Sequence, residues 1–441
     1  MPFLGGQVGF CRLRASLPTA ATLQREHLDK CAEHTIATNP TDAGERPGEV
    51  EFGWTGGEHI EDNQFSLDKN AWLDGQLAHL GVRVDTNKVP AEVARAIRAR
   101  EAGSLKDAMP GMRESKKLVR EAVDRAIDDE RATGKHKRSK MVPLLWDLPR
   151  KVVLCATGAQ AFTERLANHW RVSFGAGLSQ MSSGALAADY YASKGLDRRF
   201  EDMRPSRFVD PPAGRSPGED AIDPDRPEVP WASVEPADFL GNEFLLWVWR
   251  RCETGGGRFE VTDESGAQTE VAIAMDRLLE MECAWGFTGK QTLTSTEEGI
   301  APVRMPEAAR ALQVGKWPRR AGLILAGHDR QYTLSFQADR WLVSGVTLPR
   351  PTEEEEATMT EAGDRLEARL AMIRRLDELL LAMFREFLAM RASDAWPGER
   401  ERISAWIRER AGAEKQRRAV APAEPVEVHL PEDAHDASLA S

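Results

Sequence analysis

A dense group of basic side chains consists of Lys135, Lys137, Arg138 and Lys140, inside the stretch GKHKRSKMVPLLWDLPRKVVLCATG (134–158). Lysine and arginine gathered in this way can neutralise the phosphates of a nucleic acid, which requires charge and not a catalytic geometry. An isolated run of this kind is ordinarily a solvated loop. Whether the neighbouring segments are also basic therefore decides between the two interpretations.

The charge around this group runs against the balance of the whole chain, whose net charge is −11 over 441 residues. Residues 88–151 carry 17 Lys and Arg against 10 Asp and Glu, a local charge of +7 that leaves −18 for the remainder. Four of these cations, Arg113, Lys116, Lys117 and Arg120, lie at the start of a predicted helix. Positive charge at the N-terminal end of a helix interacts unfavourably with the helix dipole. Cations that are kept at such a position suggest a functional reason, such as binding a polyanion.

A second group of basic residues occurs far along the chain and comprises Lys290, Lys316, Arg319 and Arg320. Trp317 lies among them in GKWPRR. Aromatic rings interleaved with cations can stack on bases, so Trp317 is the exception among tryptophans that we otherwise expect in the core.

Signatures of catalysis are absent from the sequence, which has no G-x-x-x-x-G-K-[ST], H-E-x-x-H or G-x-S-x-G. The five cysteines are widely spaced and never form C-x-x-C, which argues against a disulfide framework or a zinc site. A metal-dependent nuclease would need carboxylates beside a lysine. Only Asp147 before Lys151 and Glu114 before Lys116 offer that, at spacings expected by chance. We therefore expect no enzyme, no metal and no cofactor.

The elements that would position the cations are both strands and helices, which predicts an α+β fold. Strand-like alternation occurs at Val8 and Phe10, although Arg12 falls on the same face. Helical spacing predicts one helix from Pro90 and a longer one on both sides of Lys117. The basic run then leads into MVPLLW and KVVLCAT, two short strands joined by a tight turn.

Composition divides the chain into two halves. The stretch 204–236 holds eight prolines in 33 residues and reads as a linker or insertion. It separates an N-terminal α+β region (1–203), with the basic helices and hairpin, from a C-terminal α+β region (237–391). The latter ends in a long amphipathic helix, for which packing on its own core is favoured over a dimer seam. Residues 392–441 are expected to hold a short helix and a disordered tail from about Gly412.

The remaining bulk properties are those of an ordinary globular protein, with 41% hydrophobic and 29% charged residues. No apolar stretch approaches the roughly 18 residues that cross a membrane. The opening MPFLGGQVGFCRLR does not resemble a secretory signal. We expect a cytoplasmic protein with no membrane partner.

The order of these elements resembles the recombination-associated protein RdgC family of bacteria. VGFCRLRASLP, EFGWTGG and LAHLGVRVDTNKVPAEVARAIRARE are similar to its first strand, Gly-Trp loop and following strand and helix. The basic run with its hairpin resembles the corresponding segment, and PEAARALQVGKWPRRAGLILAGHDRQYTLSF and GKQTLTSTEE resemble elements near the family's C-terminus. These patches cover most of residues 5–390. The Pro-rich insertion, the extra length and the tail depart from the family pattern.

The resemblance implies two α+β halves that form part of a ring-shaped homodimer with a basic central hole. It also implies nonspecific binding to double-stranded DNA on the nucleoid and restraint of RecA-promoted recombination. The residues expected to contact phosphates are Arg113, Lys116, Lys117, Arg120, Lys135, Lys137, Arg138, Lys140, Lys290, Lys316, Arg319 and Arg320.

Two alternatives stay open at this point. One is a DNA-processing nuclease with a divergent site. The other is a protein-interaction scaffold without DNA binding, whose basic helices are merely solvated and whose long helix at 361–391 would offer an apolar patch.

Overall fold

The computed structural model describes residues 3–17, 20–36, 50–108, 116–212, 226–231, 235–262, 266–286, 289–295, 301–327 and 330–420. It confirms the α+β fold class. Thirteen strands in these segments join in one antiparallel sheet, whose main path is β10-β9-β11-β12-β13-β1-β6-β5-β4-β2. The N-terminal strand β1 pairs with β13 on one side and β6 on the other, so it joins the two halves of the chain.

The strands lie in two groups along this path. Those of the N-terminal half are β1 (Val8–Ala15), β2 (Val50–Thr55), β3 (Ala71–Trp72), β4 (Leu77–Asn87), β5 (Lys137–Asp147), β6 (Val152–Cys155) and β7 (Leu178–Gln180). Those of the C-terminal half are β8 (Arg258–Thr262), β9 (Gln268–Cys283), β10 (Gln291–Thr294), β11 (Lys316–Gly327), β12 (Arg330–Gln337) and β13 (Leu342–Thr347).

The helices cover the sheet or project from it. Those before the proline-rich stretch are α1 (Arg25–Glu33), α2 (Leu67–Asn70), α3 (Ala91–Ala108), α4 (Lys116–Ala132), α5 (Gln160–Phe174), α6 (Ser183–Ser193) and α7 (Asp197–Glu201). Those after it are α8 (Phe239–Thr254), the 3₁₀ helix η1 (Pro302–Arg304), α9 (Pro306–Gln313), α10 (Glu353–Thr358), α11 (Ala362–Ala392) and α12 (Trp396–Val420). None of these described helices is both long and apolar enough to cross a bilayer.

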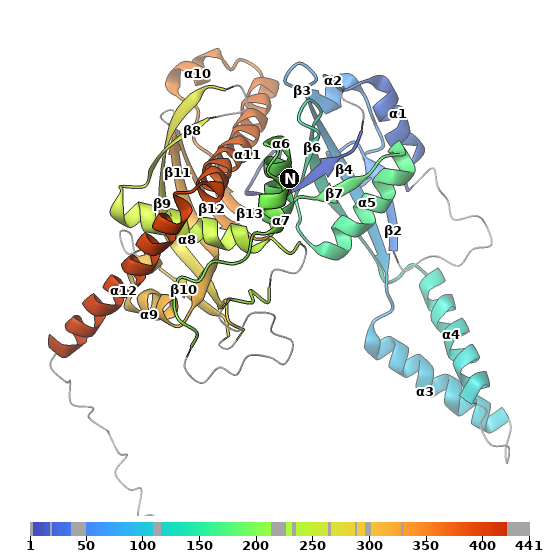
Figure 1. Ribbon diagram of the computed structural model, residues 1–441. Helices are drawn as coiled ribbons and strands as arrows, with labels where there is room; N and C mark the ends of the chain where they lie inside the picture. Colours follow the sequence, from blue (N-terminus) through green and yellow to red (C-terminus); the bar gives the residue numbers. More distant parts are fainter. Residues whose placement is uncertain are drawn as a thin grey trace, which may run out of the picture.

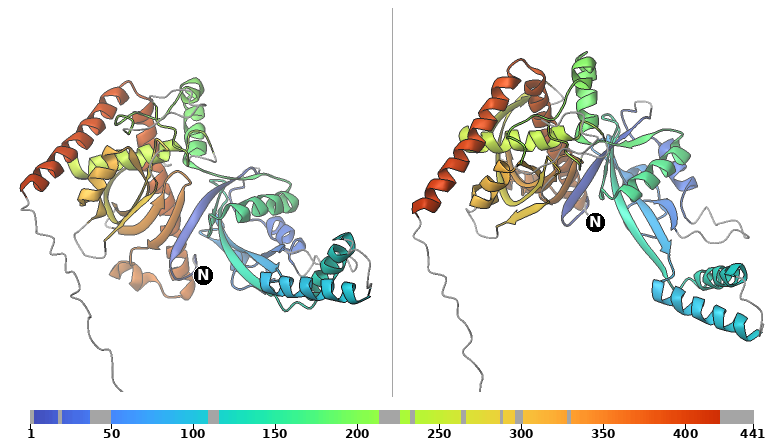
Figure 2. Two further views of the ribbon diagram at one scale, coloured as in Figure 1. Left: turned by 90° about the horizontal axis from the view of Figure 1, so that it is seen from below. Right: turned by 60° about the horizontal axis from the view of Figure 1, so that its bottom comes forward.

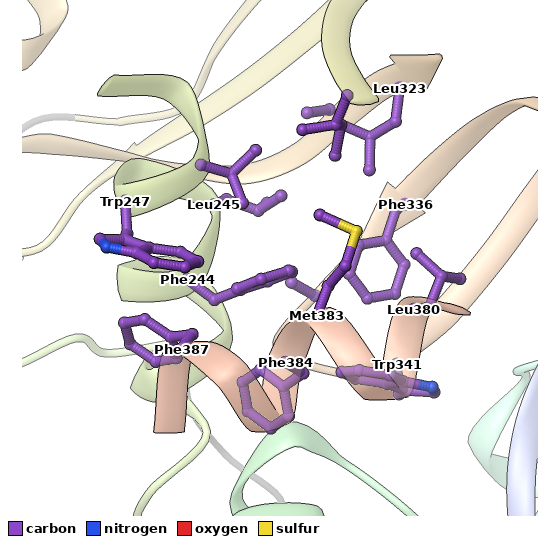
Figure 3. Close-up of a cluster of buried hydrophobic side chains, with 14 of the residues drawn as sticks. Phe244, Leu245, Trp247, Leu323, Phe336, Trp341, Leu380, Met383, Phe384 and Phe387 are labelled. Atoms are coloured by element: carbon purple, nitrogen blue, oxygen red, sulfur yellow. The ribbon is translucent and has the colours of Figure 1, made fainter. Parts of the chain in front are cut away.

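The larger core lies between the C-terminal strands and the helices α8 and α11 (Figure 1). Phe384 of α11 meets the rings of Phe244 and Trp341 with centroids 5.4 and 5.1 Å apart (Figure 3). Leu323 and Phe336 reach this cluster from β11 and β12. The expectation that the long helix packs on its own core is therefore confirmed, because the apolar side chains that would form a patch under the scaffold alternative are largely buried against that core.

A second core fills the N-terminal half, between the sheet and α5. Trp146 of β5 and Trp170 of α5 lie with ring centroids 5.0 Å apart, and Phe174 lies 4.6 Å from Trp170. Trp54 of β2 donates its indole N–H to the Ser173 hydroxyl at 2.8 Å. These tryptophans are core residues, as expected.

The imperfect alternation of β1 has a physical cause. Arg12 does lie on the core face with Phe10, and it is only 6% exposed. Its guanidinium donates to the carboxylate of Asp377 on α11, which also accepts from Arg150 Nη2 at 3.1 Å. Burial alone would raise the pKa of Asp377, but the two guanidiniums outweigh it and lower that pKa. Arg12 can occupy the core face because its charge is neutralised in a buried ion pair with Asp377.

The helices α3 and α4 form a helical hairpin inserted between β4 and β5. They pack on each other, and Ile97 of α3 and Val123 of α4 are buried. All three views show this helical hairpin projecting away from the rest of the molecule (Figures 1 and 2). At the other end of the chain, α12 continues to Val420, so the helix is longer than expected and does not end near Gly412.

Candidate nucleic-acid interface

The base of the helical hairpin carries four exposed cations, Lys88, Lys135, Arg138 and Lys140. The register of β4 and β5 pairs Asn87 with Lys137, which brings the four to the same end of the sheet. None of them forms an ion pair with any residue that the structure describes. We call them the hairpin-base cations. Lys88 was not among the residues predicted from the sequence. It directly follows β4, and the pairing of that strand with the basic run on β5 is the signal that could have identified it.

The alternation of β5 separates two kinds of basic residue. Arg138 and Lys140 point to the face that carries α5, and Lys140 Nζ lies 6.0 Å from the centre of the Phe162 ring. Lys137 points to the opposite face. Its Nζ lies 3.1 Å from both the Glu51 and the Asp85 carboxylates.

Lys137 belongs to a small ion-pair network that is internally neutralised. Arg83 holds the buried Asp85 with two contacts of 2.8 Å. Burial would raise the pKa of Asp85, but hydrogen bonds from Arg83, Ser139 and Lys137 lower it. These groups stabilise the sheet and leave Lys137 little charge to offer a ligand.

The candidates on α4 are exposed at the start of the helix. Lys116 has no ion pair in the described part of the chain, while Lys117 lies 3.9 Å from Glu121 and Arg120 lies 3.8 Å from Asp124. Such exposed pairs contribute little, so these cations stay accessible. Later turns of α4 are acidic, which confines the positive surface to its first turns. Arg113 lies outside the described residues.

The second group of candidates is brought together beside β9, but among carboxylates. Arg319 Nη1 lies 2.8 Å from Glu282, and its Nε lies 3.2 Å from the buried Asp339. Lys290 lies 3.7 Å from the same Glu282. The others are also engaged: Arg320 with Glu280 at 3.3 Å and Lys316 with Gln291 at 3.2 Å. This group is less suited to phosphates than the hairpin-base cations.

The expectation for Trp317 is wrong. Its indole is buried, and its ring centroid lies 5.4 Å from that of Phe208. Trp317 alternates with Lys316 along β11, so the ring enters the core while its basic neighbour lies on the other face. It cannot stack on a base.

Asp147, the carboxylate of one candidate nuclease pair, is engaged in ion pairs with arginines. Asp147 is buried, and its carboxylate lies 2.9 Å from Arg374 Nε. Burial raises the pKa of Asp147, against the opposing effect of Arg150 and Arg374. Within the described segments, no three His, Cys, Asp or Glu side chains converge to hold a metal ion. Glu114 lies outside those segments.

These features describe an α+β protein with four exposed cations, without an ion pair among the described residues, at one end of its sheet and below a projecting helical hairpin. No protein-family model matches the chain, and no curated protein matches it. The resemblance to the RdgC family stays a prediction.

Proposed function

We propose that this chain is a non-enzymatic protein that binds double-stranded DNA without sequence preference. The observation that supports this most directly is the group of hairpin-base cations, which are exposed and have no carboxylate partner among the described residues. Unpaired cations are free to replace the counterions of DNA phosphates. Such cations contact the phosphate backbone, which carries no direct sequence information, and not the edges of the bases.

The strand geometry supports the same ligand. Arg138 and Lys140 are two residues apart on β5, which separates them by about 6.8 Å along the strand. Adjacent phosphates of one DNA strand lie roughly 7 Å apart, because the strand winds around the axis while it rises about 3.4 Å per nucleotide. The pair can therefore follow one backbone, with Lys88 and Lys135 extending the contact toward the helical hairpin.

The resemblance to the RdgC family supports the wider role. On this proposal the protein forms a ring-shaped homodimer on the nucleoid in the cytoplasm and restrains the access of RecA to DNA. The projecting helical hairpin would carry the cations to the inner edge of such a ring. Sedimentation of the purified chain tests the dimer, and a monomer at micromolar concentration would contradict it.

The first test is fluorescence anisotropy of the full chain with labelled duplexes of unrelated sequence, across several salt concentrations. Four phosphate contacts per protomer predict a slope of log K against log salt of about −3.6. All duplexes should bind alike. An absence of binding at low salt would refute the proposal in favour of the scaffold, and loss of the DNA with Mg²⁺ would favour the nuclease.

Neighbouring residues of β5 should respond differently to the loss of charge. We expect Arg138→Met to weaken duplex binding roughly tenfold and to reduce the salt slope by about 1. Lys137→Met should leave DNA affinity within about twofold, because its charge is already paired. It should instead lower the free energy of unfolding by about 1–2 kcal/mol, since the buried Asp85 loses a partner. Equal effects of the two variants on DNA affinity would contradict this division.

A further inference from the structure

A cavity of about 600 Å³ lies between α6 and α11, over β1 and the turn that joins β5 to β6. The volume lies in the range of sites for small molecules. It is separated from the hairpin-base cations by the length of β5, which is about 35 Å for a strand of this length. The cavity is therefore not part of the DNA-binding surface proposed above.

The walls of this cavity are strongly basic. Arg12 and Arg150 reach it while Asp377 fixes both guanidiniums from behind. Lys151 and Lys194 also line it, and neither has an ion pair in the described part of the chain. These two lysines come from different elements, the β5–β6 turn and the end of α6. They are free to receive an anion.

Other charged groups at the walls leave this balance positive. Arg14 is paired with Asp189, and Arg385 and Glu386 of α11 add one charge of each sign. Six cations and two carboxylates line the cavity, but Asp377, Asp147 and Glu378 neutralise Arg12 and Arg150 from outside the lining, so the positive charge left for a ligand is that of Lys151 and Lys194.

The lining also contains four buried apolar side chains, which we call the floor of the cavity: Val152, Met181, Leu186 and Leu381. Tyr190 stands beside them, and burial followed by the nearby Glu386 raises the pKa of its hydroxyl, so it stays a neutral ring. An apolar floor under a cationic wall suits a ligand that carries both a ring and phosphates.

The backbone of Lys151 provides a separate observation. Its φ is +54°, in the left-handed region where glycine is favoured. A lysine at such a position carries a conformational cost that glycine would not, and such strain gathers at functional sites. The turn therefore retains the ammonium group of a lysine, although glycine would adopt this backbone conformation at a lower conformational cost.

We propose that this cavity binds the phosphate of a nucleotide, with the phosphate between Lys151 and Lys194 and the base on the apolar floor. The nucleotide is either free in solution or the terminal residue of a DNA strand. Arg12 and Arg150 supply fixed donors behind the two lysines, because Asp377 already orients them. The site does not depend on the proposed DNA-binding function.

The test is isothermal titration calorimetry of the full chain with ATP and pyrophosphate. ATP should bind more tightly than pyrophosphate, since only ATP reaches the floor. Lys151→Gly and Lys194→Ala should each weaken ATP roughly tenfold. Lys151→Gly also relieves the left-handed backbone, so its melting temperature should not fall, and its lost affinity cannot be attributed to unfolding.

Two further variants sharpen the result. Ala389→Trp, at an exposed position on the cavity wall, should exclude ATP. Arg171→Ala removes an exposed and unpaired cation from α5, away from the cavity, and should leave ATP binding unchanged. Wild-type affinity in Lys151→Gly would overturn the proposal.

A final comparison distinguishes the two sources of the phosphate. A short single strand is titrated with and without a 5′ phosphate. If the 5′ phosphate strengthens binding, and this gain is lost in Lys151→Gly but kept in the presence of ATP, the ligand is a DNA end; loss of the gain on addition of ATP assigns the site to free nucleotides. An absence of ATP and pyrophosphate binding, together with no gain from the 5′ phosphate, would overturn the proposal. Blunt duplexes without terminal phosphates test the hairpin-base cations separately.

Discussion

A variant in which Lys135, Arg138 and Lys140 are all replaced by glutamate is expected to bind duplex DNA at least about a hundredfold more weakly than the wild type. Each of these cations is free for a phosphate, because no described carboxylate pairs with it. Three lost contacts at about 1 kcal/mol or more each correspond to about a hundredfold, and the new carboxylates add repulsion. The loss should be the same for every base sequence.

The salt dependence makes this prediction specific. Three fewer phosphate contacts should make the slope of log K against log salt shallower by about 2.7. The measurement is anisotropy across a salt series with two duplexes of unrelated sequence. Circular dichroism confirms that the variant is folded, because the three positions are exposed.

A matched control separates local contacts from net charge. Arg198, Arg365 and Arg400 are exposed, have no ion pair among the described residues, and belong to α7, α11 and α12. Replacing all three by glutamate changes the net charge by the same amount. If this control loses as much affinity as the first variant, binding depends on overall charge and the hairpin-base cations are not the site.

The sequence predicted the elements well because their signals are local. The alternation at Val8 and Phe10 became β1, and the spacing of apolar residues on both sides of Lys117 became α4. The basic character of the region at the base of the helical hairpin was equally readable. Periodicity and composition need no knowledge of which strands become neighbours.

The sequence could not tell which cations are free. Lys137 and Arg138 are adjacent and look alike, yet Glu51 lies opposite one of them through β2 and β4. Arg319 is neutralised by Glu282, which β9 brings beside β11 from 37 residues earlier. Such partners depend on strand register, and register is set by the packing of the whole sheet. The same holds for the cavity, whose walls come from segments far apart along the chain.

The second large effect is expected for Asp377→Asn, which should lower the free energy of unfolding by about 3–5 kcal/mol. Asp377 is fully buried and holds Arg12 of β1 and Arg150 of the β5–β6 turn against α11. Arg150 also has Asp147 at 3.6 Å, but Arg12 would be left as a buried charge without a carboxylate. Urea unfolding with an unchanged m-value measures the loss.

An exposed pair of the same type is the control for burial. Asp394 lies 3.0 Å from Arg199 and is fully exposed, so Asp394→Asn should cost less than about 1 kcal/mol. The pH dependence gives a second check. Because the folded pKa of Asp377 is lowered, its contribution is present above the unfolded value of about 3.9 and is lost as the pH falls further. The difference between wild type and Asp377→Asn should therefore shrink below about pH 4.

The position of this ion pair determines what its loss does to the molecule. Arg12 lies on the strand that pairs with both β13 and β6, and Asp377 lies on the helix that covers the larger core. Because these two elements belong to both halves, breaking the pair should destabilise both. Fluorescence probes in either half should then report the same unfolding transition, shifted to lower urea concentration. Trp54 lies in the core of the N-terminal half and Trp341 in the larger core. If their surroundings unfolded at different urea concentrations in the variant only, the role of Asp377 would be to couple the two halves and not to stabilise either one.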